Sequence, residues 1–224
     1  MPPAPVPADL TAAASTSEAV SDPHSELDRQ AAVWAGLGHE LSDLALDSLR
    51  AALADDPTAP TTQERVPFVL VVPGAGIPAE RAMARTSLGG RPGSVNQHAG
   101  DIDSFAPMRS VGQPPAGAYL LVDVERGSEF CGVPPELAVI TLAERGRTPL
   151  TVAEGVALIT VHPEVLETNH CFSLAGSRAG DRRVPAIWIS KRAPHLGWCF
   201  AGTPHSWLGV ASAGARRPPP ASSA

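Results

Sequence analysis

The sequence predicts an α+β fold in which a mainly antiparallel sheet of about five strands is covered by two or three helices and preceded by an N-terminal helical hairpin. Apolar residues recur at helical spacing before residue 58, and short β-branched runs follow residue 65. A composition of 43% hydrophobic and 18% charged residues is typical of a globular chain. The expected organisation is a disordered tail at 1–21, a helical hairpin at 22–57, a linker at 58–64, an α+β domain at 65–213 and a disordered tail at 214–224.

The helical hairpin is expected to begin at Asp22 and Pro23, because Asp is a good N-cap and Pro a good first helical residue. Its first helix should end near residues 36–38, which read GLG. Two short amphipathic helices are not stable alone, so their apolar stripes need a partner surface. The stripes are Leu27, Ala31 and Trp34 in the first helix and Leu46, Leu49 and Leu53 in the second.

Two apolar runs, Val66–Val72 and Tyr119–Val124, predict buried strands. A short helix is expected from Pro78, directly after the first of them. Between the two strands, Leu88–Gly117 is rich in Gly and Pro, and a loop of this length in a compact domain suggests a binding loop.

The middle of the chain carries two further helices. Pro135–Arg145 has helical character, and Gly146 should stop it. Thr151 and Glu154 have the spacing of a capping box, which predicts a second helix that ends at His162.

The last third changes to short extended runs, which predict a meander of antiparallel strands. The runs are Cys171–Leu174, Val184–Ser190 and Leu196–Phe200. The middle run has apolar residues on both of its faces, so we expect it to lie centrally in the sheet.

Charge and composition exclude several classes of protein. The net charge of −6 argues against general nucleic-acid binding, since the phosphate backbone favours a positive surface. There is no Lys or Arg before Arg29 and no apolar run long enough to cross a membrane, so we expect a cytoplasmic protein without membrane contact. The three cysteines are an odd number without a disulfide-type spacing, and we expect reduced thiols.

A glycine-rich turn follows the first strand, in the pattern Gly74-x-Gly76-x-x-Ala79. These letters match the dinucleotide-binding fingerprint, but that unit also needs a second strand with a terminal acidic residue about 20 positions on. The corresponding region here, RPGSVNQHAGD, has no apolar run. We therefore interpret the glycines as a simple strand-to-helix turn, and the sequence identifies no cofactor.

The loop at 175–183 is the best ligand-binding candidate, because glycines let backbone N–H groups converge and guanidinium groups bind phosphate or carboxylate through two points. The alternative is a solvated hairpin in which Asp181 pairs with its neighbours. The candidate ligand-binding residues are Ser177, Arg178, Asp181, Arg182 and Arg183 in this loop, with Trp198 and Trp207 beside it.

The segment 198–209 contains the candidate catalytic pair, Cys199 and His205. An imidazole beside a thiol lowers the thiol pKa and produces a nucleophile. Zinc binding that also uses Cys171 is disfavoured, because no ligands occur at C-x₂₋₄-C spacing, and we predict no metal site. The remaining alternative is that Cys199 is a small buried core residue.

Four stretches resemble an uncharacterised actinobacterial family that is catalogued only as a domain of unknown function. They are YLLVDVERGSEF, RGRTPLTVAEGVAL, CFSLAGSRAGDRRVPAIWIS and LGWCFAGTPHSWLG, and the resemblance covers residues 65–213. It implies no activity, cofactor or catalytic residue. The leading hypothesis is therefore a protein that binds a small anionic ligand through its C-terminal β module, with catalysis left open. The alternative is a non-enzymatic module that binds a protein partner through the acidic helices, the 88–117 loop and the tails.

Overall fold

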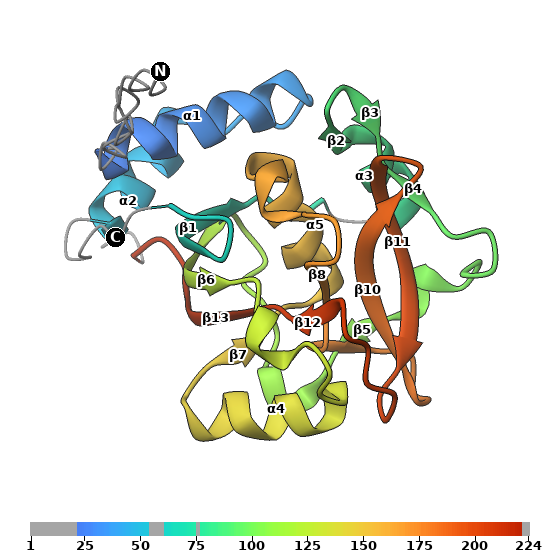
Figure 1. The fold of residues 1–224 in the computed structure, drawn as a ribbon. Helices are drawn as coiled ribbons and strands as arrows, with labels where there is room; N and C mark the ends of the chain where they lie inside the picture. Colours follow the sequence, from blue (N-terminus) through green and yellow to red (C-terminus); the bar gives the residue numbers. More distant parts are fainter. Residues whose placement is uncertain (1–21, 54–60, 75–76, 221–224) are drawn as a thin grey trace, which may run out of the picture.

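The computed structural model describes residues 22–53, 61–74 and 77–220, which form an α+β fold (Figure 1). The predicted fold class and the N-terminal pair of helices are confirmed. The tail expected at 1–21 and residues 58–60 of the linker expected at 58–64 lie outside the described residues. The α-helices within the described ranges are α1 (Pro23–Gly36), α2 (Asp43–Leu53), α3 (Ala79–Arg85), α4 (Pro135–Glu144) and α5 (Val152–Val161).

The strands form two larger sheets where the sequence predicts one. The first sheet is antiparallel, in the order β1 (Arg65–Val71), β6 (Tyr119–Glu125), β13 (Ser212–Arg217) and β7 (Thr148–Pro149). The second has the order β12 (Leu208–Val210), β8 (Cys171–Ser173), β10 (Arg183–Ser190), β11 (Ala193–Phe200) and β4 (Ser94–Val95). Its two outer pairs are parallel and its inner pairs antiparallel. The expected meander is thus present as β8, β10 and β11, with β10 in the centre.

The remaining elements are short, and several of them lie in the long loop expected at 88–117. Two small ladders are β2 (Ser87–Leu88) with β3 (Arg91–Pro92), and β5 (Ala106–Pro107) with β9 (Ser177–Arg178). The single turns of 3₁₀ helix are η1 (Ile102–Ser104), η2 (Arg109–Val111), η3 (Ser128–Phe130) and η4 (Pro163–Val165).

β13 corrects the expected C-terminal tail at 214–224, because the described chain remains in a strand as far as Arg217. The sequence of β13, SAGARR, has little β propensity, so most of it is predicted to belong to a disordered tail. Pairing with β6 and burial of the Arg216 guanidinium against Glu154 provide the tertiary contacts that override the local preference.

α5 is the central element and lies between the two sheets (Figure 1). The capping box predicted for it is present: the Thr151 hydroxyl accepts the Glu154 N–H, and the Glu154 carboxylate accepts the Thr151 N–H. Seven of its residues are buried, which explains why helical periodicity is hard to see in its almost wholly apolar sequence.

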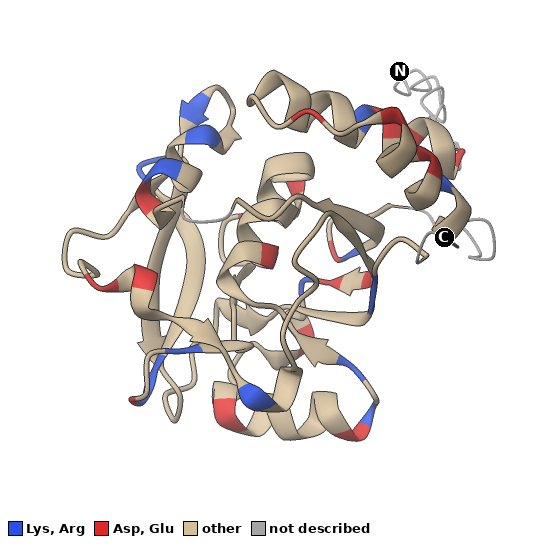
Figure 2. Cartoon of the chain, turned by 180° about the vertical axis from the view of Figure 1, so that it is seen from behind, with Lys and Arg blue, Asp and Glu red and all other residues tan. Residues whose placement is uncertain are grey.

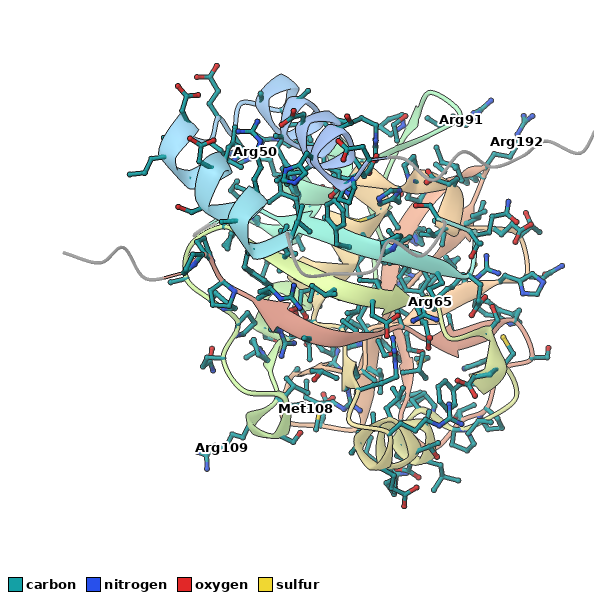
Figure 3. The ribbon with its side chains drawn as sticks, turned by 90° about the vertical axis from the view of Figure 1, so that its left-hand side faces the viewer. Arg50, Arg65, Arg91, Met108, Arg109 and Arg192 are labelled. Carbon is teal, nitrogen blue, oxygen red and sulfur yellow. The ribbon has the colours of Figure 1, made fainter. Side chains whose placement is uncertain are left out.

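α1 covers the open edge of the first sheet, beside β1 (Figure 3). The buried Gln30 amide donates to the Phe68 carbonyl and accepts the Leu70 N–H at 2.6 Å, as a neighbouring strand would. The Trp34 indole donates to the Leu70 carbonyl at 2.9 Å. Because an unpaired strand edge is costly to bury, these two side chains fix the position of α1 on the sheet. Of the acidic residues of α1 and α2, Asp28, Asp43 and Asp47 are exposed, whereas Glu26 is partly buried. Figure 2 shows the positions of Asp and Glu along the chain.

Two glycines let the backbones of the two sheets touch. Gly127 follows β6 with a φ of 77°, and Gly209 lies in β12. A Cβ on Gly127 would lie 2.0 Å from the Val210 carbonyl oxygen, and a Cβ on Gly209 would lie 2.3 Å from the Gly127 oxygen. Neither position tolerates a side chain without a backbone shift.

We predict that Gly127→Ala is far more destabilising than Gly132→Ala. Both glycines have positive φ, but nothing lies within 4 Å of the Cβ position of Gly132. Gly132→Ala should therefore cost only the left-handed backbone strain, about 1–2 kcal/mol. Gly127→Ala adds a backbone clash and should cost about 3 kcal/mol or more. Equal losses in urea unfolding would contradict the contact.

A buried charge cluster attaches α1 to the end of α5. The His162 ring lies 3.3 Å from Glu26 and 2.9 Å from Glu164. Burial favours the neutral ring, but hydrogen bonds to Glu164 and Glu26 outweigh it and raise the His162 pKa. Burial likewise opposes ionisation of Glu26, yet hydrogen bonds from Arg29, His162 and Gln30 lower its pKa to about 2.

These shifts predict how stability depends on pH. A raised His162 pKa stabilises the fold below pH 6.5, its unfolded value, and this contribution is lost as pH rises through the folded pKa. The Glu26 contribution is present above pH 4.5 and is lost as pH falls towards 2. We expect the difference in urea midpoint between wild type and His162→Gln to be largest between pH 4.5 and pH 6.5 and to shrink towards pH 9. A difference independent of pH would contradict the assignment.

Candidate functional site

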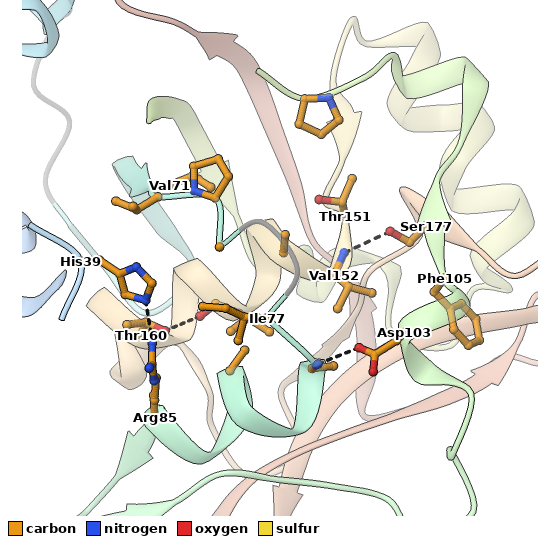
Figure 4. A pocket seen from close by; sticks show the side chains of 18 of the residues that line it. His39, Val71, Ile77, Arg85, Asp103, Phe105, Thr151, Val152, Thr160 and Ser177 are labelled. Atoms are coloured by element: carbon orange, nitrogen blue, oxygen red, sulfur yellow. Dashed lines mark hydrogen bonds between the residues drawn. The ribbon is translucent and has the colours of Figure 1, made fainter. Parts of the chain in front are cut away.

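A cavity of about 250 Å³ lies where α1, β1, α3 and α5 meet (Figure 4). α5 contributes Val152, Val156 and Thr160, which lie four residues apart and so share one face of the helix. Side chains from four further segments complete an apolar wall: Trp34, Val71, Ile77 and Phe105. Concave, mainly apolar sites of this kind are the usual binding places for small molecules.

Arg85 and His39 form one polar end of the cavity. The Arg85 guanidinium donates from Nη1 to His39 Nε2 at 2.6 Å, so the imidazole accepts at that atom. Arg85 is exposed and forms no ion pair with any carboxylate of the described residues. Its positive charge is therefore available to a ligand.

Asp103 and Ser177 lie towards the other end (Figure 4). One carboxylate oxygen of Asp103 accepts the Ala79 N–H at 2.7 Å. The Ser177 hydroxyl oxygen accepts the Val152 N–H at 3.1 Å, in the first turn of α5. The second oxygen of Asp103 has no hydrogen-bond partner within the described ranges, so it can accept a hydrogen bond from a ligand.

A buried ion pair lies at the start of α5, next to Thr151 in the cavity wall. The Glu154 carboxylate is fully buried and accepts hydrogen bonds from Tyr119, Thr151 and Arg216. Burial and the neighbouring Glu154 charge raise the Tyr119 pKa. Every oxygen of this carboxylate is engaged, so the cluster positions the N-terminus of α5 and leaves no group free for chemistry.

The arginines of the 175–183 loop each have a partner in the protein. Arg178 donates to the carbonyls of Ala175 and Ser177. Arg183 pairs with Asp101 and Asp181, and the exposed Arg182 lies 3.6 Å from Glu136. These contacts are the ones expected for the alternative to anion binding, a solvated hairpin in which Asp181 pairs with its neighbours.

The loop nevertheless supports the cavity. The Arg183 guanidinium lies 5.4 Å from the ring centres of both Phe105 and Trp198, and Phe105 lines the cavity. Ser177 lines it directly. Of the residues that the sequence singles out, Ser177 therefore lines the cavity, Arg183 lies behind Phe105 of its wall, and Trp198 contacts Arg183.

Cys199 and His205 are not joined by any hydrogen bond between described residues. Cys199 is buried, with Ser173 Oγ 3.8 Å from its sulfur. Burial raises the pKa of the Cys199 thiol, and the Ser173 hydrogen bond and the Arg178 charge offset this only in part. The His205 ring instead packs against Trp207, with ring centres 5.6 Å apart. All three cysteines are free thiols, and the described residues contain no metal-binding group of His, Cys, Asp or Glu.

We predict that Cys199 resists alkylation at pH 7 in the folded protein, because a buried thiol with a raised pKa forms little thiolate. The measurement uses a variant with Cys131→Ser and Cys171→Ser, so that only Cys199 reacts. Labelling should follow unfolding in urea. Rapid labelling of the folded protein that slows in His205→Ala would instead support the catalytic pair.

Sequence reasoning misses the polar ends of the cavity, because His39, Arg85 and Asp103 come from separate elements and belong to no motif. The glycine-rich turn contributes Gly74 to the wall, and its residues 75–76 lie outside the described residues. β1 pairs antiparallel with β6, so a parallel dinucleotide-binding unit is not formed there.

Comparison with known proteins gives one match. The sequence model of a family of unknown function (DUF5701) matches residues 33–219, which is most of the chain. No curated protein and no solved structure matches. None of the helices in the described ranges is both long and apolar enough to cross a membrane.

Proposed function

The chain belongs to the DUF5701 family, whose function is unknown, and from its own residues we propose that it binds a small organic anion with an apolar body in the cavity between α1, α3 and α5. The observation that carries this proposal is a guanidinium without a carboxylate partner at one end of an apolar cavity. The proposal keeps the small anionic ligand expected from the sequence and assigns it to another site.

The apolar wall determines the body of the ligand. Trp34, Val71, Ile77 and Val156 offer hydrocarbon and ring surface without hydrogen-bonding groups, apart from an indole N–H already bonded to Leu70. Burying apolar ligand surface here is favourable by about 25 cal/mol per Å². A fully hydrated ion such as free phosphate gains nothing from this wall.

The two polar ends determine the groups at the ends of the ligand. Arg85 can bind a carboxylate or phosphate through two N–H groups. The free oxygen of Asp103 can accept a hydrogen bond from an amino or hydroxyl group. The best ligand is then an apolar carboxylate that carries a donor at its far end.

Thr151 lines the cavity and its hydroxyl donates to Glu154, but Tyr119 and Arg216 also occupy that carboxylate, so binding is the function proposed here. The catalytic pair considered from the sequence, Cys199 and His205, does not line the cavity. The alternative of a protein-interaction module finds one supporting observation in exposed apolar side chains. These are Leu44 on α2, which is 71% exposed, and Leu137 and Ile140 on α4 and Phe200 at the end of β11, each about half exposed.

We predict that apolar carboxylates raise the melting temperature of the protein through Arg85. The panel is acetate, hexanoate, 6-aminohexanoate and phenylacetate. A ligand that binds only the native state raises the melting temperature. Hexanoate and phenylacetate should do so because they have apolar bodies that the cavity wall can bury, whereas acetate should not. The amino compound should exceed hexanoate in wild type but not in Asp103→Asn.

The matched control is Arg81, an exposed arginine on the same helix that does not line the cavity. Arg85→Gln should reduce the affinity for carboxylates about tenfold or more, which corresponds to the loss of one charged hydrogen-bonding partner. Arg81→Gln should leave it unchanged. If no member of the panel raises the melting temperature of the wild type, the proposal fails and the protein-partner alternative gains weight.

A further inference from the structure

A second hollow, a surface groove of about 560 Å³, lies between β4 and the turn that joins β10 to β11. Its lining includes Arg91 near one end and Lys191 in the turn, together with the imidazoles of His98 and His195 and the amides of Asn96 and Gln97. None of the residues that line it is acidic. The groove shares no lining residue with the apolar cavity.

The charges of this groove are unusual for the molecule. In the described residues most arginines are paired with a carboxylate, as expected in a chain whose net charge is −6. Arg91, Lys191 and Arg192 have no such partner within those ranges. Arg91 and Arg192 project from the same corner of the molecule (Figure 3), where Lys and Arg gather beside β3 (Figure 2). Arg91 and Lys191 line this hollow and Arg192 is the next residue in the turn, whereas Arg81, Arg85, Arg109 and Arg178, which also lack a carboxylate partner among the described residues, do not line it.

The backbone conformation of the turn between β10 and β11 also favours a functional role for its two cations. Lys191 and Arg192 both have positive φ, 52° and 64°. A two-residue hairpin turn of this kind strongly prefers Asn-Gly, because residues with a long side chain are strained in the left-handed region. The chain therefore places two cations at the turn despite a backbone that favours other residues, and such strain is typical of functional sites.

We propose that this groove binds a small molecule with two or more phosphate groups. Arg91 and Lys191 both line the groove and come from different hairpins, so a polyanion can contact both, whereas a single phosphate is much smaller than 560 Å³. Arg192 does not line the groove, but it is next to Lys191 in the same turn and adds its charge there. His195 is oriented by Ser94, whose Oγ lies 2.9 Å from Nδ1, and this leaves Nε2 as a further contact. The amides add neutral donors.

The same charges argue against a nucleic acid as the ligand. A nucleic-acid surface needs positive charge along the path of the backbone, whereas the rest of this chain is acidic. Beyond the groove, Asp28 of α1 and Asp43 and Asp47 of α2 are exposed to solvent. A compact polyphosphate contacts the basic corner alone.

The test compares inorganic triphosphate, pyrophosphate and phosphate at constant ionic strength by calorimetry, with the His195 imidazole signals followed by NMR. Triphosphate should bind at least tenfold more tightly than phosphate and shift the His195 signals. In Lys191→Asn/Arg192→Gly the affinity should fall at least tenfold while the melting temperature rises, because the new turn relieves the strained backbone. A variant that is more stable but binds less separates loss of the site from loss of the fold.

The control is Arg109→Gln, since Arg109 is also exposed and lies at a different corner of the molecule (Figure 3). Its affinity for triphosphate should equal that of the wild type. The proposal is overturned if triphosphate binds no better than phosphate, if Arg109→Gln weakens binding as much as the turn variant, or if a ten-nucleotide single strand binds more tightly than triphosphate. Arg85→Gln should leave triphosphate binding intact, so this result is independent of the ligand in the apolar cavity.

Discussion

The buried carboxylate of Glu154 is the group on which most of the described fold depends. A buried charge is tolerated only when its partners are in place, and here they come from β6 through Tyr119, from β13 through Arg216 and from the cap of α5 through Thr151. Arg216 also donates to the Val111 carbonyl, so the long loop before β6 is tied to the same point. One ionised group thereby fixes the central helix, two strands and a loop relative to one another.

The apolar cavity follows from this arrangement. α5 is fixed between the sheets, and its face at Val152, Val156 and Thr160 points into the cavity. α1 packs across the end of β1 and contributes Trp34 to the opposite wall. α1 is held there through Gln30 and Trp34, which bond to the edge of β1, and through the contact of Glu26 with His162 at the end of α5. Polar contacts thus fix the position of α1 on the sheet, and the cavity lies beneath its C-terminal end.

Local rules were sufficient where a structure is determined by neighbours in sequence. The Asp22 cap, the Thr151–Glu154 capping box and the runs that form β1, β6 and β10 are of this kind, since their partners lie a few residues away or are simply the core. Contacts between distant residues were not predictable. Arg183 pairs with Asp101, 82 positions earlier, and this partner for one of the three arginines of the predicted anion site could not be seen in the sequence. β13 needs β6, and the polar ends of the cavity need three separate elements.

The passage from β12 to β13 has a dynamic consequence. Val210 ends a strand of one sheet and Ser212 begins a strand of the other, with Ala211 alone between them. A connection this short and buried leaves no hinge, so the two sheets cannot separate or slide without breaking ladders on both sides. We therefore expect α1 and α3, which lie outside both sheets, to move when a ligand enters the cavity, while the two sheets keep their relative position.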